Sequence, residues 1–407
     1  MISVDDALKR IRDSLTPLGA EQVSLSEAYG RVLAEDLAAR RTQPPFAVSA
    51  MDGYAVRAAD IARLPTRLKL VGYVQAGGRH DGQVGPGEAV RIFTGARLPD
   101  GADAVVIQED TEAGDGEVLV RDTVGPFEPG RHVRQAGIDF VEGQIGLKAG
   151  QRLTARDVGL AAAMNRPWLS VHRRPRVAIL PTGDEVVLPG DPLGPNQIVS
   201  SNGAALGALV AAAGGVPIQL GIARDDTDVL KTMALGAAGA DLLVTIGGAS
   251  VGEHDLVRKA LGELGLSVDF WKIAMRPGKP LMFGQLGTTA VLGLPGNPVS
   301  ALVCGMLFLR PALERLQGLA GDGPALEPAR AGAGLKLNDG RQDYLRARLS
   351  RDADGALVAT PNAKQDSSMM SALAGADCLI VRPPAAAAVA VGGRIDIIRL
   401  SDSNALL

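Results

Sequence analysis

The central part of the chain repeats one order of elements: an apolar run, a loop, and a stretch with helical periodicity. The apolar runs are RVAIL (176–180), PIQLGIA (217–223), DLLVTIGG (241–248) and TTAVLGLPGNP (288–298). Helical stretches such as SNGAALGALVAAAG and VSALVCGMLFLRPALERL follow them. Short apolar runs that alternate with helices are typical of parallel strands joined by crossover helices. The sequence therefore predicts an α/β fold with a doubly wound, mostly parallel sheet.

The segments on either side of this part have a different character. Residues 4–16 show helical periodicity, whereas residues from about 46 to 140 are rich in glycine and proline. That second segment contains short β-like runs such as RLKLVGYV and EAVRIFTGA. Short strand patterns return after the Gly-, Pro- and Ala-rich joint at 318–334. We therefore expect a β-rich module before the α/β domain and a small all-β domain after it, with boundaries near 46, 140, 175 and 325.

Charge and composition exclude several classes of partner. The chain has 407 residues, a net charge of −3 and only 3% aromatic residues. It has no basic stripe and few rings on which bases could stack, so we expect no nucleic-acid partner. Asp5 and Asp6 argue against a signal peptide, and the apolar stretch 301–309 is too short to span a bilayer. We expect a cytoplasmic protein that binds no membrane.

The two cysteines point to packing rather than to chemistry. Cys304 lies in ALVCGMLFL and Cys378 in ADCLIV, and both runs are apolar. Two isolated cysteines provide neither a disulfide framework nor a zinc site. We therefore expect both thiols to be small core residues.

Acidic residues follow three of the predicted strands. Asp184 and Glu185 come after the first strand, Asp225 and Asp226 after the second, and Glu253 and Asp255 after the third. Loops at the carboxyl ends of parallel strands meet at one edge of the sheet, where ligands bind. Carboxylates there repel a phosphate unless a divalent cation lies between them, and Mg²⁺ accepts oxygen ligands and shares them with phosphates. The edge predicts a Mg²⁺-phosphate site, and a solvated acidic rim remains the alternative.

The loop TIGGASVGEHDLV (245–257) resembles two catalytic motifs without completing either. Gly248 to Gly252 match the G-x-S-x-G pattern of a hydrolase, with Ser250 as the nucleophile. A hydrolase also needs a distant downstream histidine, and of the four histidines (His80, His132, His172 and His254) only His254 follows Ser250. No lysine follows the glycines, which excludes a P-loop. The remaining interpretations are an anion-binding turn and a tight turn whose acidic residues suit the helix dipole.

Two further loops offer groups for an anion. GLPGNPVSA (293–301) has two prolines and two glycines before a helix, which suggests rigid backbone amides near a ligand. Its alternative is a helix start with Asn297 as the cap and Pro298 at the first helical position. MRPGKP (275–280) brings Arg276 and Lys279 together around a turn, either as an oxyanion clamp or as a solvated basic turn.

In combination these segments resemble one family. SAMDGYA, RIFTGARLPDGADAVV, PTGDE, IVSSNGAAL, GGASVGEHD, MRPGKPLMFG and LPGNPVSA occur in this order in the molybdopterin molybdenumtransferases, which include the related domain of gephyrin. The resemblance implies an elongated homodimer. It further implies four regions per subunit: a discontinuous N-terminal region (1–46 and 141–175), a β-rich inserted module (47–140), an α/β domain of molybdopterin-binding type (176–324) and a C-terminal β-barrel (325–407).

The resemblance also implies a reaction and the residues that serve it. The family takes adenylylated molybdopterin and molybdate, hydrolyses the adenylate with Mg²⁺, and places molybdenum on the dithiolene. By motif, the predicted catalytic residues are Asp184, Glu185, Asp255, Asp52 and Thr94, and the predicted metal ligands are Glu185, Asp225, Asp226 and Asp255. The predicted substrate-binding residues are Gly247, Gly248, Ser250, Gly252, Pro295, Gly296, Asn297, Pro298 and Asp139. The predicted molybdate ligands are Arg276, Lys279, Arg346, Ser367 and Ser368.

Within this set, Asp52, Thr94 and Asp139 would come from the partner subunit's β-rich module. The resemblance does not decide between Asp225 and Asp226, or between Ser367 and Ser368. It leaves room for a molybdopterin adenylyltransferase as a partner. The alternative functions are that adenylyltransferase activity itself, for which the extra β module and barrel are not needed, and a non-catalytic scaffold like gephyrin, for which no long linker is present.

Overall fold

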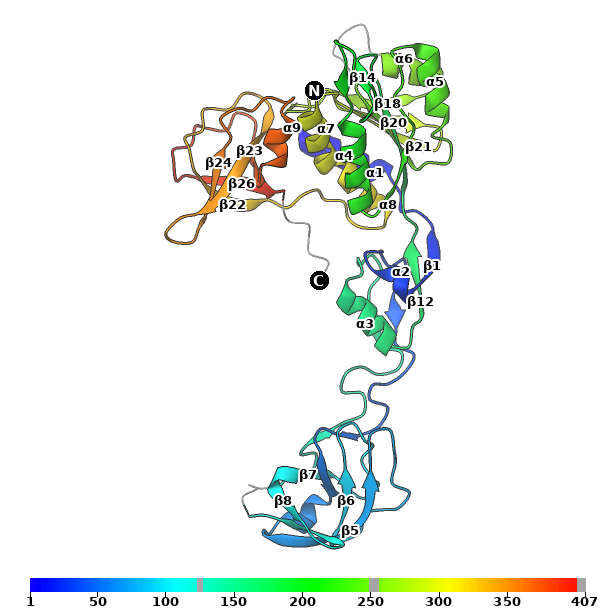
Figure 1. Cartoon of the computed structure of the whole chain (residues 1–407), viewed down its shortest axis with the longest axis vertical. Coiled ribbons are helices and arrows are strands. Elements are labelled where there is room, and N and C mark those ends of the chain that lie inside the picture. Colours follow the sequence, from blue (N-terminus) through cyan, green and yellow to red (C-terminus); the bar gives the residue numbers. More distant parts are fainter. Residues whose placement is uncertain (123–126, 249–255, 401–407) are drawn as a thin grey trace.

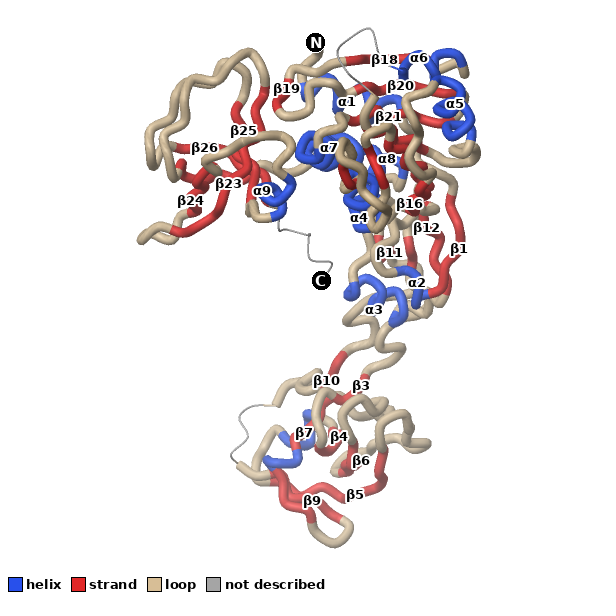
Figure 2. Tube along the Cα trace, turned by 45° about the horizontal axis from the view of Figure 1, so that its top comes forward, coloured by secondary structure: helices blue, strands red, loops and turns tan. Residues whose placement is uncertain are grey.

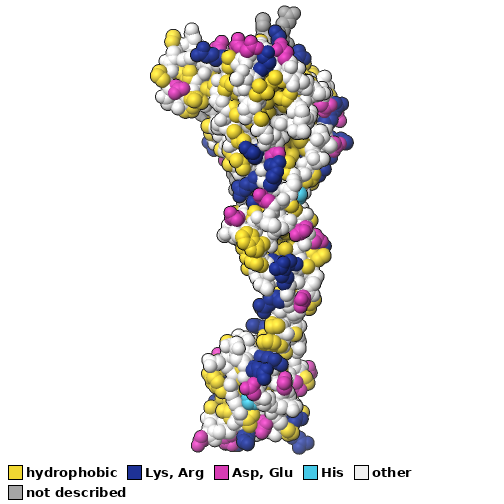
Figure 3. Space-filling model, turned by 90° about the vertical axis from the view of Figure 1, so that its right-hand side faces the viewer, with side chains coloured by type: hydrophobic (Ala, Val, Ile, Leu, Met, Phe, Trp, Pro, Cys, Tyr) yellow, Lys and Arg dark blue, Asp and Glu magenta, His cyan; other side chains and the backbone are white. Residues whose placement is uncertain are grey.

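The computed structural model describes residues 1–122, 127–248 and 256–400. The molecule is elongated, with the β-rich module at one end and the α/β and C-terminal domains side by side at the other (Figure 1). A narrow region joins the two ends, and on the face shown in Figure 3 basic and acidic side chains are interspersed along the whole length. Within the described residues, no helix has the length and apolar character needed to cross a membrane.

The α/β domain contains a six-stranded sheet in the order β16-β13-β17-β21-β20-β18. The first four strands are parallel, and β20 runs antiparallel to both of its neighbours. The strands are β13 (Arg176–Pro181), β16 (Val216–Gln219), β17 (Leu242–Ile246), β18 (Ser267–Trp271), β20 (Met282–Leu286) and β21 (Thr289–Leu294). A short pair beside the sheet is formed by β14 (Val186–Val187) and β15 (Ile198–Val199). The predicted doubly wound, mostly parallel sheet is confirmed.

Both faces of this sheet are covered, as its sequence pattern requires. Alternate residues of β13 point to opposite faces: Val177 and Ile179 belong to one apolar core, and Ala178 and Leu180 to another. The helices on the first face are α1 (Val4–Ser14), α4 (Asn202–Ala212), α7 (Pro298–Cys304) and α8 (Arg310–Leu316). Those on the second face are α5 (Thr227–Leu235) and α6 (Leu256–Glu263).

Helix α1 has an amphipathic pattern and starts at the N-cap Ser3, whose side chain accepts a hydrogen bond from the amide of Asp6. Its buried residues Ala7 and Ile11 pack in the α/β core. By its packing, α1 thus belongs to the α/β layer, although the resemblance groups its residues with the N-terminal region.

The long helical stretch at 299–316 contains a widened turn. A π-helical segment, η3 (Gly305–Leu309), separates α7 from α8. Pro311 has no amide hydrogen to donate to the carbonyl of Leu307 and would clash with it in a regular α-helix, so the widened turn accommodates this proline.

The N-terminal region is built from two separate stretches of chain. Strand β1 (Ala20–Ser24) pairs with β12 (Trp168–His172), and β2 (Leu37–Ala38) pairs with β11 (Ile145–Leu147). Helices α2 (Leu25–Ala28) and α3 (Ala155–Ala163) complete a small core with these strands.

Between these stretches lies the β-rich module. A two-residue pair, β3 (Val48–Ser49) with β10 (Val133–Arg134), forms its neck, and its main sheet has the order β7-β4-β6-β5-β9-β8. The strands and short helices are β4 (Gly53–Val56), η1 (Ala58–Ile61), β5 (Thr66–Val74), β6 (Glu88–Ile92), β7 (Ala104–Ile107), η2 (Gln108–Asp110), β8 (Thr111–Ala113) and β9 (Glu117–Val120).

The C-terminal domain is a closed barrel of five strands, in agreement with the prediction, because β23 pairs with both β24 and β25. Its elements are β22 (Glu327–Ala331), β23 (Gln342–Arg351), β24 (Leu357–Pro361), α9 (Met370–Ala374), β25 (Cys378–Arg382) and β26 (Arg394–Arg399). A two-residue strand of the α/β domain, β19 (Met275–Arg276), adds to β23 and so ties the barrel to that domain (Figure 2).

Candidate functional site

Two glycine loops meet at the carboxyl edge of the parallel strands. Gly247 and Gly248, directly after β17, have φ angles of 88° and 65°, which favour glycine. A Cβ at Gly248 would lie 2.3 Å from Cγ2 of Val257. A Cβ at Gly296 would lie 3.5 Å from the Cα of Gly247, so the loop after β21 touches the loop after β17. The predicted substrate-binding residues of these two loops are thus brought together, whereas Ser250, Gly252 and Asp255, with Glu253 and His254, lie outside the described residues.

Three carboxylates gather at the same edge. The amide of Asp225 donates a hydrogen bond to Oδ1 of Asp184 at 3.2 Å. The pKa of the Asp225 carboxyl is raised from its usual value, first by burial and then by the negative charges of Asp184 and Glu185. In the described part of the chain, no group of histidine, cysteine, aspartate or glutamate side chains is arranged as a metal site. The negative charges of Asp184 and Glu185 oppose ionisation of Asp225, and a bound cation would relieve this repulsion.

Asp226 takes a different role from its neighbour. Its side chain accepts hydrogen bonds from the amides of Asp228 and Val229, both at 2.9 Å, and so caps α5. Of the two adjacent aspartates, Asp225 is the one whose charge interacts with Asp184 and Glu185.

The start of α7 is completed by the barrel. Pro298 occupies the first helical position as expected, but the side chain of Asn297 makes no capping hydrogen bond. The backbone carbonyl of Ser367 accepts from the amide of Val299 at 3.1 Å, and Nδ2 of Asn297 donates to Oγ of Ser367 at 2.8 Å. On the other side of this loop, Nδ2 of Asn202 donates to the carbonyl of Gly296 at 2.7 Å. Asn297 thus occupies the N-cap position as predicted, but the barrel loop, and not its own side chain, satisfies the helix end.

Arg346 on β23 is a buried cation with unpaired donors. Arg346 is 1% exposed, and its Nε and Nη2 atoms have no hydrogen-bond partner among the described residues. Burial lowers the pKa of the guanidinium, and the nearby carboxylate of Asp366 opposes this shift. A buried guanidinium with unpaired donors is costly unless an anion binds it.

The two candidate serines differ in what they contact. Both the amide and the hydroxyl of Ser368 donate to Oδ1 of Asp366, at 2.8 and 2.7 Å. The hydroxyl oxygen of Ser367 instead accepts a hydrogen bond from the side-chain amide of Asn297. Among the predicted molybdate ligands, Ser367 is thus the serine whose hydroxyl lies at the contact between the two domains.

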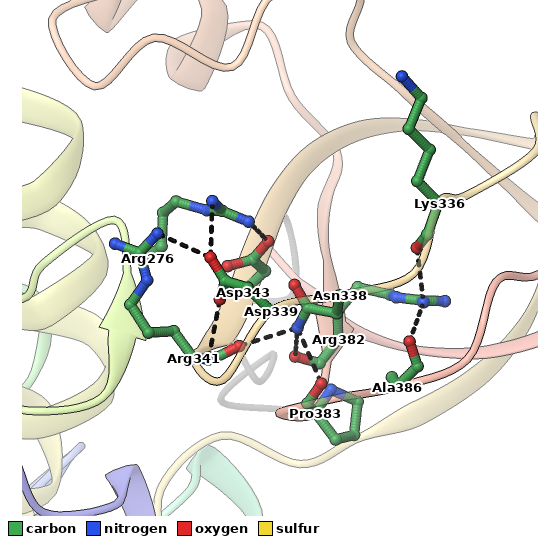
Figure 4. Close-up of polar contacts among 9 residues, drawn as sticks. All are labelled: Arg276, Lys336, Asn338, Asp339, Arg341, Asp343, Arg382, Pro383 and Ala386. Atoms are coloured by element: carbon green, nitrogen blue, oxygen red, sulfur yellow. Dashed lines mark hydrogen bonds and ion pairs between the residues drawn. The ribbon is translucent and has the colours of Figure 1, made fainter.

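Arg276 is engaged by carboxylates of the barrel (Figure 4). Its Nη2 pairs with Oδ2 of Asp343, and its Nη1 lies 3.3 Å from Oδ2 of Asp339. The hydrogen bond to Asp343 is the main cause that raises the pKa of Arg276. Arg341 also donates to Asp339, at 2.8 Å. These contacts lie where β19 joins β23, so Arg276 is part of the junction between the two domains.

The turn that carries these aspartates is held by further polar contacts (Figure 4). Nδ2 of Asn338 donates to the carbonyls of Arg341, Arg382 and Pro383, at 2.8, 3.1 and 2.8 Å. The other predicted cation of this region, Lys279, is half-buried, and its ammonium has no partner in the described residues. Lys279 is therefore available to an anion in a way that Arg276 is not.

Asp52 and Thr94 pair closely, but in the β-rich module. Oδ1 of Asp52 accepts from both the amide and the hydroxyl of Thr94, each at 2.7 Å. These hydrogen bonds lower the pKa of the Asp52 carboxyl. The third residue expected with them, Asp139, is exposed beside the neck of the module. Within one chain, the β-rich module lies at the far end from the α/β domain (Figure 1).

The structure adds residues that the motifs did not single out. Gln365, Asp366, Asn202, Asp339 and Asp343 make contacts at the site, and the first two directly precede the predicted serines in KQDSSMM. The two cysteines are buried as predicted, and Sγ of Cys304 packs 3.8 Å from the carbonyl of Gly278.

The fold and the site define a multidomain α/β protein whose C-terminal barrel contacts the α/β domain at the start of α7. Family models match almost the whole chain: "MoeA N-terminal region (domain I and II)" at residues 2–165, "Probable molybdopterin binding domain" at 178–315 and "MoeA C-terminal region (domain IV)" at 328–400. The chain belongs to the molybdopterin molybdenumtransferase family, and it is a transferase.

Individual relatives support this assignment over most or all of their length. A molybdopterin molybdenumtransferase of Nostoc is 38% identical over 362 residues, which cover 86% of this chain and 82% of that protein. One from Haemophilus influenzae is 34% identical over 98% of both chains. The crystal structure of a molybdopterin biosynthesis MoeA protein from Pyrococcus horikoshii superposes with a TM-score of 0.85, with 35% identity over 98% of this chain and 99% of that one.

Proposed function

We propose that this chain transfers molybdenum from molybdate to adenylylated molybdopterin, with Mg²⁺-dependent hydrolysis of the adenylate and release of AMP. The observation that carries this proposal is the buried guanidinium of Arg346, whose Nε and Nη2 have no protein partner in the described residues. It lies on the barrel strand that docks beside α7, close to the loop that carries Ser367. A cation and a hydroxyl at the junction of two domains suit a small oxyanion such as molybdate.

The chemistry of the donors fits this assignment. Molybdenum on a dithiolene is bound by sulfur, but both cysteines of the chain are buried in apolar cores. The sulfur therefore comes from the substrate, and the protein supplies cations and hydroxyls for the oxyanion.

The acidic edge supports the magnesium part of the proposal. The pKa of Asp225 is raised by burial and then by the negative charges of Asp184 and Glu185, which lie near it. When bound, Mg²⁺ would supply a positive charge shared between these carboxylates and the substrate phosphates. The glycine loops at Gly247, Gly248 and Gly296 let the backbone approach the substrate closely, because they touch each other without side chains.

We further infer a homodimer with a shared site. Asp52 and Thr94 form a preorganised pair on the β-rich module, far from the α/β domain of the same chain (Figure 1). A second copy is the source from which such a pair would complete the site. The cytoplasmic location and an adenylyltransferase partner stay predictions.

An assay that measures the release of AMP from adenylylated molybdopterin by chromatography tests the proposal. We expect release that requires both Mg²⁺ and molybdate, and strong impairment in Asp255→Asn and Arg346→Ala. Equal release without molybdate, or full activity of Asp255→Asn, would contradict it. Formation of adenylylated molybdopterin from molybdopterin and ATP would instead identify the chain as the adenylyltransferase.

A further inference from the structure

We propose that Asn297 and Gln365 are positioning residues that fix the oxyanion pocket from its two sides. Neither is expected to touch the anion. Asn297 would orient the hydroxyl of Ser367, and Gln365 would set the distance between the Ser367 loop and the strand that carries Arg346. This inference rests on the proposed function, because it concerns the same molybdate pocket.

Asn297 orients Ser367 through one hydrogen bond. Nδ2 of Asn297 donates to Oγ of Ser367 at 2.8 Å, so the serine oxygen acts as the acceptor in this contact. The hydroxyl hydrogen of Ser367 then remains to be donated, and the described residues contain no acceptor for it. Asn297 can serve in this way because the carbonyl of Ser367, and not its own side chain, satisfies the amide of Val299. A donor hydroxyl held in this orientation is suited to an anion.

Gln365 takes the place of a missing strand partner next to Arg346. Strand β24 pairs with β23 only from Ala347 onward, so it leaves the Arg346 amide without a partner from that strand. Oε1 of Gln365 accepts from the amide of Arg346 at 3.0 Å, and its Nε2 donates to the carbonyl of Arg346 at 2.9 Å. The carbonyl of Arg346 also accepts a hydrogen bond from the amide of Asn362, directly after β24, at 2.8 Å. Gln365 therefore supplies the one strand-type hydrogen bond that is missing, the acceptor for the Arg346 amide. This contact fixes the loop 365–368 to the backbone of the residue with the buried guanidinium.

The two contacts act on the same short loop from opposite domains. Asn297 belongs to the α/β domain, whereas Gln365, Ser367 and Arg346 belong to the barrel. The carboxylate of Asp366, between Gln365 and Ser367, acts on the pKa of Arg346 and so lies near it. The pocket is therefore assembled only when the barrel is docked on α7, with its hydroxyl and guanidinium held before the anion arrives.

Titration calorimetry of the full chain with molybdate alone tests the role of Asn297. We expect Asn297→Ala to weaken molybdate binding about tenfold, the loss typical of a hydrogen bond to a charged group. Asn297→Asp should weaken molybdate binding at least as much. Its carboxylate would accept a hydrogen bond from the Ser367 hydroxyl, which is then no longer available to the anion. In Ser367→Ala, a further Asn297→Ala change should cost less than about twofold, because Asn297 acts through that hydroxyl.

Gln365→Ala should weaken molybdate binding several-fold. Gln365→Glu keeps the acceptor for the Arg346 amide, so it should bind molybdate more tightly than Gln365→Ala but less tightly than the parent chain. Gln342→Ala is the matched control: its amide donates to the hydroxyl of Tyr344 on the same strand, at 2.7 Å. We expect this control to bind molybdate like the parent chain. In steady-state assays, the KM for molybdate should rise in the Asn297 and Gln365 variants, and in the Gln365 variants the KM for adenylylated molybdopterin should stay unchanged.

The outcomes separate this inference from the proposed function. If Arg346→Ala and Ser367→Ala lose molybdate binding but Asn297→Ala and Gln365→Ala do not, the positioning roles are wrong and the pocket stands. Additive losses in the Asn297→Ala, Ser367→Ala double variant would also overturn the role of Asn297. If Arg346→Ala and Ser367→Ala bind molybdate normally, the pocket itself is wrongly placed and the proposed function loses its main support.

Discussion

Asp225 and Asp226 are adjacent and identical in type, yet their carboxylates meet different surroundings. Asp226 accepts two backbone amides at the start of α5, while Asp225 lies near the charges of Asp184 and Glu185. The first arrangement caps a helix, and the second opposes ionisation of the Asp225 carboxyl. Residue identity alone therefore does not set the role of a carboxylate at the edge of the sheet.

These surroundings predict opposite effects of substitution on stability. Folding raises the pKa of Asp225 above its usual 3.8. The ionised carboxyl therefore destabilises the fold once the pH rises through the range between 3.8 and the higher pKa of the folded state. In Mg²⁺-free buffer at pH 7, Asp225→Asn should therefore raise the Tm, and below that range the gain should vanish. Asp226→Ala should cost about 1 kcal/mol at pH 7, because a helix cap is lost.

Thermal unfolding of the two variants across pH checks this assignment. In the activity assay, Asp225→Asn should also demand more Mg²⁺, whereas Asp226→Ala should not. A Tm for Asp225→Asn below that of the parent chain at pH 7 would show that Asp225 is not held among repelling charges.

At the scale of elements, the loop after β17 depends on the absence of a side chain. Gly248 has a φ of 65°, and a Cβ there would meet Val257 at 2.3 Å. We expect Gly248→Ala to lower stability by about 1–3 kcal/mol and to reduce turnover, because the loop must shift away from α6. Gly262→Ala within α6 is the control, since its Cβ would meet nothing within 4 Å. It should leave stability unchanged or raise it, and equal losses in both variants would refute the steric argument.

The junction between β19 and β23 is the second element with a measurable role. The side chain of Asp343 is 6% exposed and pairs with Arg276, whose side chain is 48% exposed. Asp343→Asn should lower the free energy of unfolding by about 1–2 kcal/mol, a loss moderated by the exposure of Arg276 to solvent. Calorimetry should show a lower Tm, and limited proteolysis should show faster cleavage between the domains.

The matched control is Asp354→Asn, because that carboxylate lies 3.4 Å from Arg330 and its side chain is 78% exposed. It should leave the Tm unchanged. A Tm for Asp343→Asn equal to that of the parent chain would mean that backbone pairing alone holds the barrel in place.

Local patterns predicted the elements better than the contacts between them. The strands β13, β17 and β21 follow from apolar runs bounded by glycine and proline, and these signals are local. The contact between Asn297 and Ser367 joins residues 70 positions apart and exists only because the barrel docks on α7. No periodicity encodes such docking. For the same reason the sequence could name Arg276 as a cation but could not show that Asp339 and Asp343 already pair with it.

The elongated shape of the whole molecule separates the predicted site residues. Asp52 and Thr94 lie on the β-rich module, and Arg346 lies near the α/β domain at the other end (Figure 1). If two copies share each site, Asp52→Asn and Arg346→Ala should each be inactive alone and should complement each other when mixed. Random mixing would yield half heterodimers with one intact site each, so about a quarter of the parent activity should return.

Unfolding and refolding the two variants together before the AMP-release assay measures this recovery. Mixing without subunit exchange is the control and should stay inactive. Failure to recover activity in proven heterodimers would mean that each chain completes its own site.

The central claim is that the oxyanion binds where the barrel meets α7. A crystal of the chain grown with molybdate or tungstate, with the heavy atom located by anomalous scattering, tests this claim most directly. We predict a single strong peak whose oxygens lie within hydrogen-bond distance of Nε or Nη2 of Arg346 and of Oγ of Ser367. A strong peak elsewhere, with the guanidinium of Arg346 still unpaired, would contradict the account.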